Sequence, residues 1–336
     1  MGRTAKEFLE FFSGIGLVRE GLAPGGWRCV FANDNDERKN GVYLDRFPDD
    51  DALCQDDVND TRKILARLPK QAFLATSSFP CVDLSRAGKQ KGISGPHSSA
   101  FHGFVRVLRG LGRRKPKVLL LENVPGLLTT RGGTDFRIVA REIAGLGYFL
   151  DAFLLNAAHF TPQNRQRLFI VGVTKELKPG RVISGRGPLP DRPSELTTAR
   201  LDKLIRETPL PTGWVRFPLP SPPSTKQTLL DIVDLDEGGK WWPDPRVDKV
   251  FRQIPDNHRR ILREKLVSRT TWAGTIRTNH RGGRTWADLR LDGLAGTILT
   301  PRAAGGRQIL VVTKDGHLKM RWLTARECGK LQGAAS

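Results

Sequence analysis

The chain has 336 residues, of which 38% are hydrophobic and 27% are charged. This composition allows a large folded core and is not that of a disordered protein. The 55 Lys and Arg residues exceed the 35 Asp and Glu residues, which gives a formal net charge of +20. An excess this large favours a polyanionic partner, nucleic acid first, although a merely basic surface would have the same composition.

The sequence contains four cysteines, Cys29, Cys54, Cys81 and Cys328. No two of them form a CxxC pair. This spacing argues against a zinc site or a disulfide framework and fits a reducing compartment. The N-terminus has no long apolar signal region, and no stretch approaches the length of a membrane span. We therefore expect a cytoplasmic, nucleoid-associated protein that binds neither a metal nor a membrane.

Short apolar runs alternate with helical patterns from about residue 7 to residue 173, which is typical of parallel α/β structure. The pattern predicts strands at 8–12, 27–32, 72–76, 118–121 and 168–173. Helical spacing is present at 100–111 and 136–146. The run 118–121 is apolar at every position, as expected for a central parallel strand.

The texture of the sequence changes after about Lys175, where Pro and Gly become frequent and periodicity is weak. From about Leu294 the sequence again looks ordered. We predict a catalytic and cofactor-binding domain at 1–175, an irregular target-recognition region at 176–293, and a return to the catalytic domain at 294–336.

A glycine turn joins the first predicted strand to a helix, in the segment Ser13-Gly14-Ile15-Gly16. Glycine lets the backbone turn tightly and approach a ligand closely. Asp34 follows the second predicted strand, where a carboxylate can accept hydrogen bonds from ribose hydroxyls. The pattern fits a nicotinamide, flavin or S-adenosylmethionine site, and also a simple structural turn. Arg19 stands where the third glycine of GxGxxG would fall, which counts against a dinucleotide.

Three further groups of residues lie at the ends of predicted strands. Phe79-Pro80-Cys81 follows one strand, and Glu122-Asn123 follows the apolar run 118–121. The segment 163–167, which contains two arginines spaced by two, precedes the last strand. Ligands gather at the carboxyl ends of parallel strands, and arginines suit phosphate or a base edge. Considered singly, however, the cysteine could be a buried apolar residue, the glutamate a helix cap, and the arginines a solvated charge run.

Five segments occur in the order LEFFSGIGL, SSFPCVDLS, LLLENVPG, PQNRQRLFIVG and RWLTARECGKLQG. This set resembles the C5-cytosine-specific DNA methyltransferases of bacterial or phage type, including those of restriction–modification systems. The similarity covers residues 7–175 and 294–333 and is weak between them. The resemblance implies an α/β fold of the S-adenosylmethionine-dependent methyltransferase type, with a Rossmann-like mixed sheet and a small, irregular target-recognition domain.

The resemblance also implies the cofactor, S-adenosyl-L-methionine, and the residues that bind it. Phe12, Gly14 and Gly16 would line its methionine end, and Asp34 would bind its ribose. Asp57 resembles the acidic residue that contacts the adenine amino group. Many relatives have an aromatic residue where this chain has Asn35, so stacking on the adenine is not expected at that position.

By the same resemblance, Cys81 is the nucleophile that adds to carbon 6 of a cytosine flipped out of duplex DNA. Glu122 would hold or donate a proton at N3, and Arg165 and Arg167 would hold the base and a neighbouring phosphate and orient Glu122. Pro80, Asn123 and Gln163 are expected to contact or position the substrate.

Double-stranded DNA is the expected partner, and an arginine-rich segment supplies its expected surface. Its basic residues are Arg259, Arg260, Arg263, Lys265, Arg269, Arg277, Arg281 and Arg284. Trp272 and Trp286 are interspersed among them, and Arg277 and Arg281 are the residues we assign to substrate binding.

The sequence departs from the family pattern at two places. Val82 stands after the cysteine where relatives usually have Gln, and the chain ends at QGAAS where relatives continue into a Gly-Asn-Ser-Val-like segment beside the cofactor. We considered a truncated chain or gene, a degenerate enzyme, and a split enzyme whose complementing chain supplies the last motif. Each predicts weak cofactor binding by these 336 residues alone.

Three other functions compete with DNA methylation. The first is cytosine methylation of tRNA, which keeps the chemistry, although the large arginine-rich segment favours duplex DNA. The second is a non-catalytic or split DNA-binding subunit, against which the intact Cys81, Glu122 and Arg167 argue. The third is a Rossmann oxidoreductase, which the Pro-Cys and Glu-Asn-Val motifs disfavour.

Overall fold

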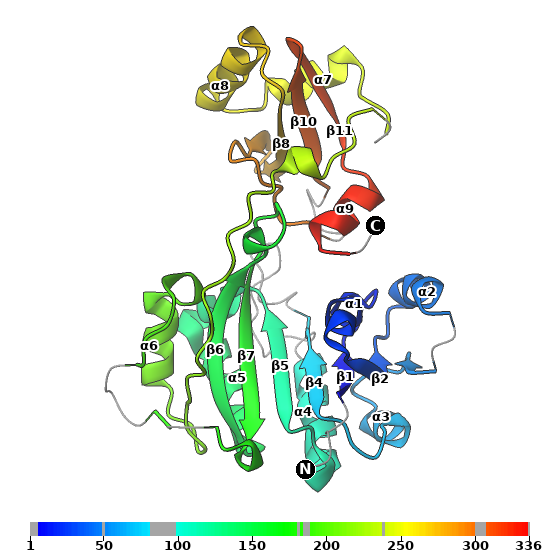
Figure 1. Cartoon of the computed structure of the whole chain (residues 1–336), viewed down its shortest axis with the longest axis vertical. Helices are drawn as coiled ribbons and strands as arrows, with labels where there is room; N and C mark the ends of the chain where they lie inside the picture. The colour runs from blue at the N-terminus through cyan, green and yellow to red at the C-terminus, as the bar shows by residue number, and fades with distance from the viewer. Residues whose placement is uncertain are drawn as a thin grey trace. The chain divides into compact units, whose positions relative to one another are not determined.

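The computed structural model describes residues 6–48, 51–80, 99–179, 182–183, 189–236, 239–299 and 307–334. The chain divides into two compact units, each considered by itself below. Unit 1 comprises the described parts of Met1–Leu155 and Gln166–Pro222, and unit 2 those of Asn156–Arg165 and Pro223–Ser336. Figure 1 labels the main elements of both units along the chain.

A seven-stranded sheet forms the centre of unit 1, in the order β3-β2-β1-β4-β5-β7-β6. Its strands are β1 (Glu7–Phe11), β2 (Arg28–Asn33), β3 (Leu53–Cys54), β4 (Leu74–Ser77), β5 (Val118–Asn123), β6 (Tyr148–Asn156) and β7 (Gln166–Thr174). Neighbouring strands from β3 to β5 run parallel, whereas β7 is antiparallel to β5. The sheet is therefore mixed, and the predicted α/β fold class is confirmed.

Helices cover both faces of this sheet. Leu9 and Phe11 of β1 belong to a core cluster with residues of α4 and α5, whereas Phe8 lies in a cluster with Tyr43 of α2. The alternation follows because successive side chains of a strand point to opposite faces. The helices of unit 1 are α1 (Leu17–Leu22), α2 (Glu37–Arg46), α3 (Thr61–Arg67), α4 (Ser99–Leu111), α5 (Thr134–Gly145) and α6 (Ala199–Glu207).

The five strands and two helices predicted from the first half of the sequence are confirmed, with ends displaced by no more than two residues. They are β1, β2, β4, β5, β7, α4 and α5. The long strand β6 escaped prediction because Tyr148–Asn156 directly follows helix α5 and lacks a strong turn signal other than Gly147.

Unit 1 continues well beyond Lys175, where the composition changes. Asp151 of β6 is almost fully buried and accepts a hydrogen bond from Arg192 Nη1 at 3.0 Å and another from the backbone of Phe217 at 2.9 Å. Trp214 stacks on Phe136 of α5, with ring centroids 5.8 Å apart. These contacts hold the proline-rich stretch 189–222 on the sheet, while the predicted division into functional domains stays a prediction.

Unit 2 contains a four-stranded antiparallel sheet in the order β11-β10-β8-β9. Its strands are β8 (Trp272–Arg281), β9 (Arg284–Leu289), β10 (Ile309–Lys314) and β11 (His317–Trp322), and its helices are α7 (Asp244–Phe251), α8 (Asp256–Val267) and α9 (Ala325–Leu331). The region is more regular than its sequence suggests. Buried positions of β8 include Ala273 and Thr275, so the strand lacks a visible alternation of large apolar residues.

Two structural findings concern membranes and metals. No helix in the described parts of the chain is both long and apolar enough to cross a bilayer. Within those same ranges, no group of three or more His, Cys, Asp or Glu side chains is arranged to hold a metal ion.

Candidate active site

The candidate site lies at one edge of the unit 1 sheet, where four parallel strands end. Phe11 of β1 pairs with Asn33 of β2 and with Ser77 of β4, and Ser77 pairs with Leu121 of β5. The loops that follow these strands therefore leave the sheet at the same edge. The antiparallel strand β7 begins there, so its first residues come beside the end of β5.

The glycine turn after β1 adopts left-handed backbone conformations at three residues. Phe12, Gly14 and Gly16 have φ angles of 60°, 58° and 82°. A Cβ atom on Gly16 would lie 2.6 Å from the Phe47 ring, so packing also requires glycine at this position. A Cβ atom on Gly14 would meet only Lys39 Cδ, at 3.9 Å, so the turn has room beside its backbone for a ligand.

Asp34 connects this turn to the end of β2. Its side chain is 6% exposed, and its two oxygens accept hydrogen bonds from the backbone amides of Gly14 and Asp36, both at 3.0 Å. Lys39 Nζ lies 3.4 Å from each oxygen. A carboxylate has about four acceptor positions, so Asp34 retains capacity for a ligand hydroxyl after bonding both amides.

A buried carboxyl group was missed by the sequence analysis. Glu10 of β1 is 1% exposed, and its carboxyl oxygens face the backbone amides of Val18 and Arg19 without a hydrogen bond of regular geometry in the described structure. Burial raises the pKa of Glu10 from 4.5 to about 8, although the positive charge of Arg19 opposes part of this rise. A carboxylate inside an apolar strand just before a glycine turn was the signal that could have identified it.

Two hydroxyl groups near the same edge also lack a hydrogen bond of regular geometry. The side chains of Ser13, in the glycine turn, and Ser77, at the end of β4, are buried and make no hydrogen bond in the part of the chain that the structure describes. Because successive side chains of a strand point to opposite faces, Glu10 lies on one face of the sheet, whereas Ser77, paired with Phe11, lies on the other.

Asp57 lies in the loop after β3. Its carboxylate is exposed and accepts hydrogen bonds from the backbone and side-chain nitrogens of Asn59, at 2.8 and 2.9 Å. Asn33 donates to the carbonyl oxygens of Cys54 and Asp56 and so holds this loop against the end of β2. The predicted ribose and adenine carboxylates thus follow two paired strands, β2 and β3.

Cys81 lies outside the described residues, but the loop that leads to it is described as far as Pro80. Pro80 is exposed, and Phe79 is 4% exposed within the core. Asn123 is buried at the end of β5, where its Nδ2 donates to the carbonyl oxygen of Phe79 at 3.2 Å. Its Oδ1 accepts from the amide of Val124, so Asn123 ties the start of the cysteine loop to β5.

Glu122 and Arg167 form an ion pair at this edge. Arg167 Nε lies 2.7 Å from Glu122 Oε1, and the two side chains are 14% exposed for Arg167 and 26% exposed for Glu122. Arg167 also donates from Nη1 to the carbonyl oxygen of Gln166. The pair forms because antiparallel β7 begins beside the end of β5, and a partly buried guanidinium keeps the carboxylate oriented.

The other three cysteines do not present a reactive thiol. Cys29 and Cys54 are buried, and Cys328 is half-buried. Burial raises the pKa of the Cys54 and Cys328 thiols. A raised pKa keeps a thiol protonated at neutral pH, and the protonated form is a poor nucleophile.

Gln163 and Arg165 belong to unit 2, unlike Arg167. Gln163 is fully buried, and its amide nitrogen donates to the carbonyl oxygen of Leu331 at 2.7 Å. Arg165 is half-buried, and its Nη1 lies 3.4 Å from the carbonyl oxygen of Ile298. A substrate contact by Gln163 would have to replace its backbone bond, and its predicted role stays a prediction.

The predicted DNA-facing residues lie on α8, β8 and β9 and in the turns that join them. Arg277 is half-buried and donates from Nη2 to the carbonyl oxygen of Thr297 at 2.6 Å, and burial lowers the pKa of its guanidinium. Arg281 is the last residue of β8, and its side chain lies outside the described part. Arg260 and Arg263 are exposed on α8, whereas Lys265 lies over the Trp272 ring.

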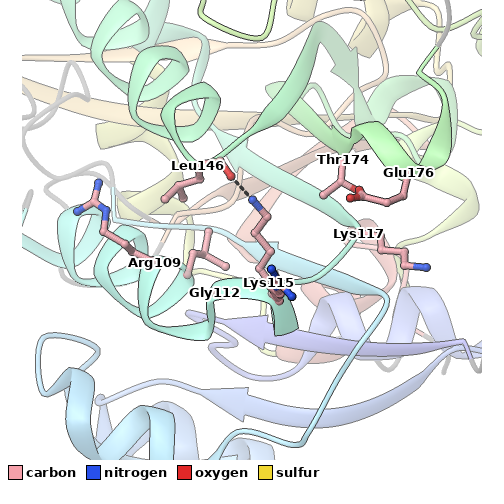
Figure 2. Close-up of a pocket in the computed structure, with 9 residues that line it drawn as sticks. Arg109, Gly112, Lys115, Lys117, Leu146, Thr174 and Glu176 are labelled. Atoms are coloured by element: carbon pink, nitrogen blue, oxygen red, sulfur yellow. Dashed lines mark hydrogen bonds between the residues drawn. The ribbon is translucent and has the colours of Figure 1, made fainter.

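A separate cavity of about 680 Å³ lies at the opposite edge of the unit 1 sheet (Figure 2). It is lined by residues that precede β5 or end β7, including Lys117 and Thr174. In Figure 2, Lys115 reaches the carbonyl oxygen of Leu146, and its ammonium also lies 5.0 Å from the Tyr148 ring. Because the length of β5 separates this cavity from Glu122, it is not part of the candidate site.

Comparison with known sequences identifies the family. Residues 6–335 match the C-5 cytosine-specific DNA methylases. Type II methyltransferase M.Bsp6I of Bacillus sp. (strain RFL6) is 31% identical over 97% of this chain and 87% of its own length. Type II methyltransferase M.MspI of Moraxella sp is 31% identical over 49% of this chain, and the match spans only 38% of that relative.

A solved structure shares the fold. The Entamoeba histolytica methyltransferase EhMeth superposes with a TM-score of 0.58 at 15% sequence identity, over 98% of this chain and 86% of that one.

Proposed function

Because the chain belongs to the family of C-5 cytosine-specific DNA methylases, we propose that it transfers a methyl group to carbon 5 of cytosine in duplex DNA. The observation that carries this proposal is the arrangement at the end of β5. There the Glu122–Arg167 ion pair stands next to Asn123, which holds the loop leading to Cys81. A carboxylate and a nucleophile loop fixed at one sheet edge suit covalent attack on a pyrimidine ring.

In the proposed reaction, the Cys81 thiolate attacks carbon 6 of a flipped cytosine and raises the electron density at carbon 5. Glu122 holds a proton at N3 of the ring, which favours that attack. Arg167 restrains the Glu122 carboxylate. Asn123 positions the loops that follow β4 and β5. Once carbon 5 carries the methyl group, a base, for which water suffices, accepts the proton from carbon 5. The electron pair re-forms the C5–C6 double bond, the C6–S bond breaks, and Cys81 is released as thiolate.

S-adenosylmethionine is the cofactor of the family, and it would supply a methyl group bound to a positively charged sulfur. The residues at the glycine turn fit this molecule. Asp34 would accept from ribose hydroxyls, Asp57 from the adenine amino group, and Phe12, Gly14 and Gly16 would border the methionine end. The buried carboxyl of Glu10 has the charge to accept the ammonium group of that end when it is ionised.

Calorimetry tests this assignment of Glu10. Approach of an ammonium group favours the ionised carboxylate, so cofactor binding near pH 7 should release a proton from Glu10. The measured enthalpy should then differ between two buffers of different ionisation enthalpy, and Glu10→Gln should remove that difference. An equal buffer dependence in both proteins would contradict the assignment.

We assign duplex DNA binding to the basic residues of unit 2. Arg260 and Arg263 on α8 and Arg284 on β9 are exposed and available to phosphates. Arg165, Gln163, Arg277 and Arg281 complete the proposed substrate-binding set, and 176–293 is the proposed target-recognition region. A cytoplasmic, nucleoid-associated location follows from this partner and is proposed with it.

Bisulfite sequencing of DNA from cells that express the chain tests the proposed activity. Methylated cytosine should appear with the unmodified protein and disappear with Cys81→Ser. Cys328→Ser is the matched control, because Cys328 lies on α9 in unit 2 and should leave methylation intact. Equal methylation with Cys81→Ser would remove Cys81 from its role, and parallel assays on duplex DNA and tRNA would identify the substrate.

A further inference from the structure

A second pocket, of about 370 Å³, lies entirely within unit 2. Its lining combines three tryptophans with three basic residues and contains no Asp or Glu side chain among the described residues. The lining residues are Gly239, Lys240, Trp241, Trp242, Arg246, Arg307, Trp322, Leu323 and Thr324. Its volume is within the range of roughly 300–1,000 Å³ that is typical of small-molecule sites.

The tryptophans are fixed by the backbone of the small sheet. Trp322 is the last residue of β11, and the amide of Trp242 donates to the carbonyl oxygen of Met320 in the same strand, at 2.8 Å. The two rings consequently meet edge to face, with centroids 5.1 Å apart and an interplanar angle of 80°. All three tryptophans are half-buried, and an arginine guanidinium lies over each ring, so a base can stack on the free part of a ring or on the arginine plane above it.

A buried ion pair supports the floor of the pocket. Arg321 is 1% exposed, and its guanidinium donates to both oxygens of Glu327 at 2.7 and 2.8 Å. It also donates to the carbonyl oxygen of Trp322, and its Cζ lies 4.9 Å from the centre of the Trp241 ring. Aromatic side chains held this way form a preorganised surface.

The exposed cations are placed over the rings. Arg246 Cζ lies 3.8 Å from the centre of the Trp242 ring, and Arg307 Cζ lies 5.0 Å from that of Trp322. Both arginines and Lys240 are exposed, and no ion pair of theirs is present among the described residues. Their guanidinium and ammonium groups are therefore available to an anion.

We propose that this pocket binds an unpaired nucleotide, with its base stacked on the tryptophans and its phosphate held by Arg246, Arg307 or Lys240. Aromatic rings and arginine planes are the groups on which unstacked bases lie, and arginine binds phosphate through paired hydrogen bonds. A base inside a duplex does not offer its face, so a single-stranded segment is the expected source. None of the residues that line this pocket is among those assigned to methyl transfer.

Fluorescence anisotropy with labelled hexathymidylate tests the stacking part of the proposal. Trp242→Leu should weaken binding by about fivefold or more, since stacking of one base on an aromatic side chain contributes about 1–3 kcal/mol. Trp27→Leu is the matched control, because Trp27 is a half-buried tryptophan of unit 1. Equal affinities of the two variants for hexathymidylate, both folded by circular dichroism, would rule out a single strand as the ligand.

The salt dependence tests the phosphate part and remains informative if Trp242→Leu does not fold. Arg246→Gln should reduce the slope of log K against log salt by about 0.7, the value for one phosphate contact on a single strand. Arg252→Gln, at an exposed position just after α7, should leave the slope unchanged. Arg307→Gln and Lys240→Gln are measured in the same way, and an unchanged slope in all three variants would overturn the proposal.

Direct calorimetric titration with adenosine monophosphate, in the unmodified protein and in Trp242→Leu, distinguishes the two sources of such a nucleotide. Binding of hexathymidylate that depends on Trp242 supports a single strand. Binding of adenosine monophosphate alone, with the same dependence, supports the pocket chemistry and identifies a free nucleotide as the ligand. Binding of neither in a Trp242-dependent manner would overturn the proposal.

Discussion

Replacement of Glu10 by glutamine should make unit 1 more stable at high pH. The buried carboxyl has a pKa of about 8, against 4.5 for an ordinary glutamate. Between these two values the native state holds a proton that the unfolded chain releases. The free energy of unfolding should therefore fall as pH rises from about 4.5 to 8 and stay low above that. A glutamine side chain has no ionisable group, so the variant escapes this loss.

The size of the effect follows from the pKa. A shift of one pKa unit corresponds to about 1.36 kcal/mol. The rise from 4.5 to about 8 therefore lowers the free energy of unfolding by at most about 5 kcal/mol above pH 8. Local relaxation and water entry reduce such penalties to a few kcal/mol. We expect the free energy of unfolding of Glu10→Gln to exceed that of the unmodified protein by about 2–5 kcal/mol at pH 9. Little of this gain should remain at pH 5.

Hydrogen exchange of peptides from β1 and β4 measures the free energy of unfolding within unit 1. It does not require the whole chain to unfold in one step. Exchange should be compared at pH 5, 7 and 9 after correction for the intrinsic rate. Glu7→Gln is the control, because Glu7 begins the same strand but is paired with Arg28 near the surface. A gain for Glu10→Gln that did not change with pH would refute the assignment of a protonated native carboxyl.

Three further predictions concern single contacts. Asn123→Ala should reduce the rate of methyl transfer by about tenfold or more and the free energy of unfolding by about 1–3 kcal/mol, because the Phe79 carbonyl loses its donor. Steady-state kinetics measures the first effect, and urea unfolding measures the second. Gly16→Ala should cost about 2 kcal/mol or more in urea unfolding, since its φ is 82° and the new Cβ overlaps a ring. Arg321→Met should cost about 3–5 kcal/mol by leaving Glu327 buried and unpaired, and the double change with Glu327→Leu should restore most of the melting temperature.

Several contacts of the candidate site could not be read from the chain. Glu122 and Arg167 are far apart in sequence, and their ion pair depends on β7 running antiparallel beside β5. Periodicity predicted both strands but carries no information about which strands pair or in which direction. Glu10 was overlooked for a related reason, because burial on both faces of a strand is decided by the helices that pack on it.

Unit 2 illustrates the same limit. Trp241 and Trp242 lie about 80 residues before Trp322, and tertiary contacts such as the hydrogen bond from Trp242 to β11 bring them to one pocket. The basic composition indicated a polyanionic partner, but composition does not show which arginines are buried and which are exposed. The structure distinguishes Arg321, buried against Glu327, from Arg246 and Arg307, which remain exposed.

The sequence by itself determined the fold class, the main strands and helices of its first 175 residues, and the order of motifs that indicates a cytosine methylase. These properties depend on local periodicity and on short segments, which are present before the chain folds. The tertiary structure alone decided the strand order, the extension of unit 1 to Pro222, and the partners of Glu122, Asp34 and Asn123. Such contacts join distant segments, and their geometry exists only after the sheet has assembled.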